Sequence, residues 1–125
     1  MSVAPTGRRT AAQETGFSAE ARAATFLEEQ GLAIVARNYR TRFGEIDLVA
    51  RDGTTLVFVE VRSRTPGGFG DAASSITAAK QRRIALAARF YLSTLTREPP
   101  CRFDVITLDG GRPAWLRAAF ETGPG

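Results

Sequence analysis

Two acidic residues lie in segments whose pattern predicts β-strands, at residues 46–51 and 56–62. Side chains alternate between the two faces of a strand, so Glu60 follows Phe58 on a face that begins apolar. A carboxylate in such a place is costly unless it pairs with a cation. Antiparallel strands joined by a short turn would bring Asp47 and Glu60 close together. Two like charges at that distance would need a metal ion or another cation between them.

Two further charged residues fall on the apolar stripes of predicted helices. Glu20 begins an i, i+3, i+4, i+7 series that continues with Ala23, Ala24 and Leu27. Lys80, the only lysine, falls among the inward positions of a second helix, which are Ile76, Ile84, Ala87 and Tyr91. Three acids and one lysine therefore predict a single polar site between the sheet and two helices.

Phosphodiester hydrolysis is the chemistry that suits such a site. Carboxylates and a backbone carbonyl can hold Mg²⁺ or Mn²⁺ through oxygen, and the ion polarises a phosphate and helps to ionise a water. A nearby cation can orient that water or offset charge in the transition state. The chain has no histidine and one cysteine, Cys101, which excludes Ser-His-Asp and Cys-His hydrolases, histidine- or thiolate-bound zinc and an intrachain disulfide.

Each of these charged residues also has a purely structural alternative. They are a salt bridge of Glu60 with Arg62, closure of the Gly44–Glu45 turn by Asp47, snorkelling of Lys80 past an apolar face, and a helix-dipole contact of Glu20 in a first helical turn. The functional interpretation rests on the four residues converging.

Composition is that of one basic globular domain. The chain has 125 residues, 43% of them hydrophobic and 24% charged, and a net charge of +4. All basic residues except Lys80 are arginines, which bind phosphate in a bidentate way, so a nucleic-acid partner is favoured. No apolar run approaches the ~20 residues of a membrane span and none resembles a secretory leader. We expect a cytoplasmic protein without a membrane partner.

The predicted elements give an α/β fold with a mixed central sheet in the order α-β-β-β-α-β. We expect a domain over residues 17–120, between flexible tails at 1–16 and 121–125. Alternation places Ile46 and Leu48 on one face of the second strand, and Asp47 with Val49 on the other. We expect a first helix from an N-cap at Ser18 to residue 30, with Gly31 as its stop. Strands follow at 32–39, 46–51 and 56–62, with a hairpin turn at Asp52-Gly53 between the last two. After a mobile loop at 63–75, a helix at 76–95 crosses over to a strand at 102–108, and a short fifth strand lies at 114–120.

Two runs, GEIDLVA at residues 44–50 and VFVEVRSR at residues 57–64, resemble the YraN-like family of small bacterial proteins. That family is regarded as a set of predicted endonucleases, similar to archaeal Holliday junction resolvases and to the PD-(D/E)xK nuclease fold. The resemblance implies a restriction-endonuclease-like three-layer core and Mg²⁺- or Mn²⁺-dependent cleavage of DNA. Supporting matches are Gly16, Glu20, Asn38, Ile76, Lys80 and the run Arg102-Phe103-Asp104-Val105.

The resemblance also implies roles for individual residues. Asp47 and Glu60 would be acidic metal ligands, and Val61 would lend its carbonyl oxygen. Glu20 would be the helix-borne acid of the resolvase branch. The lysine of the family pattern is Arg62 here, which stays protonated and cannot act as a general base, although it can stabilise an anionic transition state. Because Lys80 is expected to project toward the sheet, our own hypothesis is that it replaces the missing amine.

We therefore expect a divalent-metal-dependent endonuclease acting on DNA, with branched DNA as a candidate substrate. The alternative is a non-catalytic nucleic-acid-binding protein that retains the nuclease fold, and a third hypothesis is a protein-interaction scaffold. Nucleic-acid contacts are expected from four arginines that flank the site, Arg40, Arg42, Arg64 and Arg83, and from the glycine-containing loop at 63–75. By analogy with enzymes that cut two strands, a homodimer is expected.

Overall fold

The computed structural model describes residues 11–64, 76–110 and 112–121, with the side chains of 11–18 and 64 left out. Its elements run α1 (Ala11–Glu29), β1 (Ala33–Arg40), β2 (Glu45–Asp52), β3 (Thr55–Arg64), α2 (Ala78–Leu92), β4 (Cys101–Asp109) and β5 (Arg112–Phe120). The predicted mixed α/β fold is confirmed, including the fifth strand. Within the described residues, no helix is both long and apolar enough to cross a bilayer.

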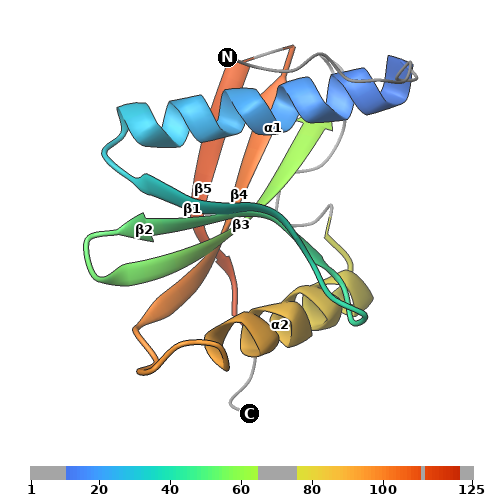
Figure 1. Cartoon of the computed structure of the whole chain (residues 1–125). Helices are drawn as coiled ribbons and strands as arrows, with labels where there is room; N and C mark the ends of the chain where they lie inside the picture. Colours follow the sequence, from blue (N-terminus) through green and yellow to red (C-terminus); the bar gives the residue numbers. More distant parts are fainter. Residues whose placement is uncertain (1–10, 65–75, 111, 122–125) are drawn as a thin grey trace, which may run out of the picture.

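The five strands form one sheet in the order β1-β2-β3-β4-β5. Neighbouring strands are antiparallel except for β3 and β4, which are parallel and joined through α2. Helix α1 covers one face of the sheet and α2 covers the other (Figure 1). The predicted crossover helix and the three-layer arrangement are therefore both present.

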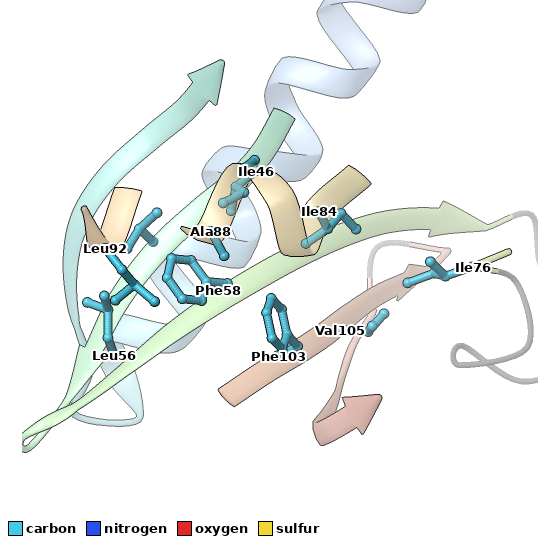
Figure 2. Close-up of a cluster of buried hydrophobic side chains, with 11 residues drawn as sticks. Ile46, Leu56, Phe58, Ile76, Ile84, Ala88, Leu92, Phe103 and Val105 are labelled. Atoms are coloured by element: carbon cyan, nitrogen blue, oxygen red, sulfur yellow. The ribbon is translucent and has the colours of Figure 1, made fainter. Parts of the chain in front are cut away.

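Each helix packs on the sheet through its own hydrophobic core. The α2-side core includes Phe58 and Phe103, whose rings stack with centroids 5.5 Å apart (Figure 2). The α1-side core is built from Ala23, Ala24, Leu27, Leu32, Leu48, Ala50, Val57, Val59 and Ile106. Strand β3 contributes to both cores, which explains its nearly continuous apolar sequence.

Helix α1 begins at Ala11, so the predicted start at Ser18 is wrong. Alanine, glutamine and glutamate in residues 11–14 are strong helix formers and extend the helix into part of the predicted tail; residues 1–10 lie outside the described residues. The C-terminal stop is as predicted. Gly31 has φ 96°, and the N–H of Leu32 donates to the carbonyl of Leu27 at 3.0 Å.

Helix α2 is shorter than the predicted 76–95 at both ends. Thr77 caps its N-terminus, where its Oγ1 accepts a hydrogen bond from the Lys80 N–H at 3.1 Å. At the other end, the hydroxyls of Ser93 and Thr94 donate to backbone carbonyls of the last turn at 2.6 and 2.7 Å. These side chains compete with continued helical pairing and end the helix at Leu92.

The connection between β2 and β3 is a tight hairpin, as predicted. Asp52 pairs with Thr55, and Gly53 adopts φ 62° in the turn between them. Most of the predicted loop at 63–75 lies outside the described residues.

Candidate functional site

The sheet opens on both sides of Asp47. The pairing of β1 with β2 skips Asn38 and Asp47, which lie opposite each other, and resumes on either side of them. The pairing of β2 with β3 reaches Leu48↔Val59 and does not include Asp47, the residue that precedes Leu48. Asn38 has φ 53°, in the left-handed region that few non-glycine residues adopt.

This opening breaks the alternation of side chains along β2. Ile46 packs in the α2-side core and Leu48 in the α1-side core, so the prediction that they share one face is wrong. The same break occurs in β1, where Ala36 and Tyr39 both pack against the α2-side core although they are three residues apart. Asp47 therefore lies beside Glu20 of α1 and beside Glu60 of β3, and Glu60 in turn contacts Lys80 of α2.

Asp47 is a half-buried carboxylate with acidic neighbours. Its Oδ2 accepts a hydrogen bond from the Val61 N–H at 2.8 Å. Burial, followed by the charge of Glu60, raises the pKa of Asp47 to about 8, and Glu20 adds to the effect. The single backbone hydrogen bond from Val61 opposes this rise and does not cancel it.

Thr41, rather than Asp47, closes the turn between β1 and β2. Its Oγ1 donates to the Gly44 carbonyl at 2.9 Å and accepts from the N–H groups of Phe43 and Gly44 at 3.0 and 3.1 Å. The structural alternative in which Asp47 closes this turn is therefore wrong. The turn also approaches α2 closely, because a Cβ added at Gly44 would lie 2.9 Å from the Arg83 carbonyl oxygen.

Glu60 is buried and pairs with two cations. It is 5% exposed, and the Lys80 Nζ lies 2.7 Å from its Oε2. The Arg62 Nη1 lies 3.8 Å from the same oxygen. The predicted salt bridge with Arg62 is therefore present, but Lys80 makes the closer contact and its ammonium does not simply extend into solvent.

Glu20 lies in the middle of α1, because that helix begins at Ala11. The helix-dipole alternative for this residue is therefore wrong. The predicted apolar stripe is confirmed, since Ala23, Ala24 and Leu27 are fully buried. Burial raises the pKa of Glu20, while side-chain hydrogen bonds with Asn38 and Asp47 act in the opposite direction.

Three carboxylates converge on the α1 side of the opening. Glu20, Glu45 and Asp47 each offer an oxygen, and these atoms lie within 4.8 Å of one another. Glu60 meets Asp47 from β3 through a side-chain hydrogen bond and through its charge. Asp47 thus connects the acids near α1 with Glu60 and Lys80 near α2.

The structure brings together the five residues predicted for catalysis, Glu20, Asp47, Glu60, Arg62 and Lys80. Sequence reasoning missed Glu45 and gave no role to Asn38. Glu45 lies two residues before Asp47, and that spacing could have placed both side chains on one face. The signal for Asn38 was weaker, because only its residue type suggested tolerance of a left-handed backbone.

The predicted nucleic-acid contacts lie around the turn between β1 and β2. The Arg40 Nε lies 3.6 Å from the Glu45 Oε2, and the Arg42 guanidinium lies 5.0 Å from the centroid of the Phe43 ring. Arg83 is exposed on α2, beside this turn. The side chain of Arg64 lies outside the described residues.

Comparison with known proteins identifies the family. The model of "Uncharacterised protein family UPF0102" matches residues 19–108. A UPF0102 protein of Cupriavidus taiwanensis is 61% identical over 111 residues, which cover 87% of this chain and 84% of the relative. One from Nitrosospira multiformis is 58% identical over 109 residues, covering 85% of this chain and 92% of the relative. The protein therefore belongs to UPF0102, the family of YraN-like proteins that its two central sequence runs resemble.

Proposed function

We propose that this protein is an endonuclease that hydrolyses DNA phosphodiester bonds with the help of Mg²⁺ or Mn²⁺. The observation that carries the proposal is the position of Asp47, a half-buried carboxylate that lies among Glu20, Glu45 and Glu60. A divalent cation is the natural compensation for such a concentration of negative charge.

The donor set fits a hard cation that prefers oxygen. Asp47 would be the shared ligand, with Glu60 and the Val61 carbonyl on the β3 side. Glu20 and Glu45 would support it from the other side, since their oxygens lie within 4.8 Å of Asp47 and of each other. Carboxylates and backbone carbonyls are the ligands that Mg²⁺ and Mn²⁺ take in proteins.

The bound cation would polarise a phosphate oxygen and lower the pKa of a water molecule. The attacking water would form a bond to phosphorus while the bond from phosphorus to the leaving sugar oxygen breaks; the proton of the water would pass to solvent, and the leaving oxygen would take up a proton from solvent. The Lys80 ammonium, held 2.7 Å from Glu60, would orient that water and offset charge on the phosphate. Arg62 would add positive charge without accepting the proton, because a guanidinium stays protonated.

Exposed arginines around the site would hold the DNA backbone. Arg40 and Arg42 lie at the turn that packs on α2, and Arg83 lies where the turn makes this contact. Arg64, at the end of β3, is proposed as a fourth contact. Branched DNA as the substrate and a homodimeric assembly are part of the proposal through the family resemblance. A cytoplasmic location is part of the proposal as well.

The test is cleavage of duplex, nicked, flap and four-way-junction DNA by the full chain in Mg²⁺ or Mn²⁺. Asp47→Asn and Glu60→Gln should each reduce cleavage by at least about tenfold, because each removes a metal ligand. Glu28→Gln is the matched control, since Glu28 is an exposed acid on α1 and should leave cleavage unchanged. Absence of metal-dependent cleavage, or equal cleavage by Asp47→Asn, would reject the proposal.

A second candidate is a nucleic-acid-binding protein that does not cleave. Arg62 favours it, because this arginine stands where the family pattern has lysine and also contacts Glu60 at 3.8 Å. DNA binding without turnover, unchanged in Arg62→Lys, would support this candidate. Strong cleavage by Arg62→Lys with little by the parent would instead identify Arg62 as the limit on a competent site. Affinity that does not fall with added salt would favour a protein-interaction scaffold, since phosphate contacts release counterions.

A further inference from the structure

We propose that Asn38 is a positioning residue that orients the Glu20 carboxylate toward Asp47 and Glu45. The inference rests on the proposed metal-dependent function, and it assigns a role to a residue that touches neither the metal nor the substrate. Asn38 is half-buried in β1 and lies opposite Asp47 where the sheet opens.

The backbone of Asn38 makes this contact possible. Its φ of 53° is unfavourable for most residues, but asparagine tolerates the left-handed region better than others. In a regular strand, residue 38 would pair with β2 and its side chain would follow the alternation of the sheet. The left-handed conformation interrupts both, and the side chain of Asn38 reaches Glu20 on α1.

The side chain of Asn38 suits the task of orienting an acid. It forms a hydrogen bond with the Glu20 side chain, in which the amide N–H donates and a carboxylate oxygen accepts. A neutral amide fixes the direction of the carboxylate without neutralising its charge. Partners of this kind commonly control how well a ligand set holds its ion.

Ala118 provides an internal comparison. Among the described residues, Asn38 and Ala118 are the non-glycine residues with positive φ, and Ala118 has φ 49°. At Ala118 a backbone hydrogen bond accounts for the positive φ, because the Ala118 N–H donates to Asp104 Oδ1 at 2.9 Å. Glycine adopts positive φ without strain, so a glycine at position 38 or 118 would preserve the backbone conformation there. At position 118 it would remove only a methyl group, but at position 38 it would also remove the hydrogen bond to Glu20.

The experiment compares Asn38→Gly with Ala118→Gly in the full chain. Mn²⁺ binding is measured by titration calorimetry without DNA, and thermal unfolding is followed in parallel. We expect Asn38→Gly to weaken Mn²⁺ binding by about tenfold without lowering the unfolding temperature. Ala118→Gly should leave the affinity unchanged.

The outcomes separate this inference from the proposed function. If the parent binds Mn²⁺ and Asn38→Gly binds it equally well, the positioning role is overturned and the metal site stands. If the parent does not bind Mn²⁺, the proposed function fails and takes the positioning role with it.

A second measurement tests the contact itself without metal. The side-chain amide signal of Asn38 in a ¹⁵N–¹H spectrum should move in Glu20→Ala and stay in place in Glu28→Gln. A signal that is unaffected by Glu20→Ala would overturn the inference.

Discussion

Two buried regions of this protein hold carboxylates in opposite ways. Asp104 on β4 is fully buried and surrounded by donors. It accepts hydrogen bonds from the Arg102 Nε at 3.1 and 3.2 Å, from the Trp115 Nε1 at 2.9 Å and from the Ala118 N–H at 2.9 Å. Arg102 continues the network to Asp52 at 3.0 Å.

Asp47, on β2, has the reverse surroundings. One backbone N–H, that of Val61, donates to it at 2.8 Å, and its other close neighbours include Glu20, Glu45 and Glu60. Hydrogen-bond donors of the fold surround Asp104 on β4. Asp47 on β2 instead lies among other carboxyl groups, and its pKa rises to about 8. Burial alone therefore does not identify a functional carboxylate; the balance of donors and acids around it does.

The strongest test of this contrast is the same substitution at both positions. Asp104→Asn should lower the free energy of unfolding by about 3–5 kcal/mol, because it removes the charge of a fully buried group that pairs with the half-buried guanidinium of Arg102. Asp47→Asn should leave stability unchanged or increase it, because a neutral amide does not have to take up a proton, as Asp47 does on folding with a pKa of about 8. Urea unfolding of both variants at neutral pH measures the difference, and equal losses would contradict the contrast.

The second prediction concerns pH. The pKa of Asp47 rises from its ordinary 3.8 to about 8 on folding, so the protonated form is stabilised in the folded state. The contribution of Asp47 to the free energy of unfolding is therefore complete below pH 3.8 and is lost as pH rises toward 8. With a chelator present, the free energy of unfolding should fall across this window by up to about 1.4 kcal/mol per pH unit. Asp47→Asn should flatten the slope and Mn²⁺ should oppose the fall; identical slopes in parent and variant would contradict the assignment.

The third prediction tests how the turn between β1 and β2 is held near the acids. Gly44→Ala would place a Cβ 2.9 Å from the Arg83 carbonyl oxygen. We expect a loss of about 1–3 kcal/mol in the free energy of unfolding and weaker Mn²⁺ binding, because Glu45 follows directly after this residue. Calorimetric titration and urea unfolding measure both effects, and unchanged metal binding would show that the turn does not position Glu45.

The smallest expected effect is that of Lys80→Met. It leaves Glu60 buried without its closest cation and should lower the free energy of unfolding by about 1–2 kcal/mol, reduced from a fully buried pair because the Lys80 side chain is 37% exposed. Arg82→Met is the matched control, since Arg82 is exposed on the same helix. If Lys80→Met is as stable as the control, Arg62 or solvent compensates for the lost ammonium.

Much of the fold follows from periodicity in the sequence. Alternation and the apolar run in β3 predicted the central strand, and helical spacing placed Glu20 on the α1 stripe and Lys80 toward the sheet. These predictions succeed because each depends on one element and on burial alone.

The rest depends on interactions between elements. A regular strand pattern does not show that alternation breaks at Asn38 and Asp47, because the break arises from one left-handed residue and the loss of pairing on both sides. The spacing of Glu45 and Asp47 could have indicated a shared face, but the position of Glu45 beside Glu20 depends on the path of the chain into β2. The predicted start of α1 was wrong because the prediction gave more weight to a favourable capping residue, Ser18, than to the helix-forming residues that precede it.

The left-handed residues also affect how this sheet meets other chains. Strands β1 and β5 are its two edges, and they contain Asn38 and Ala118 respectively. The register of each edge strand shifts as well, at Ile34/Ala36 in β1 and opposite Phe103/Val105 in β5. Neither edge strand therefore presents a long, regular row of unpaired N–H and C=O groups with which a strand of another chain could pair. Both edges of the sheet are protected in this way against edge-to-edge aggregation.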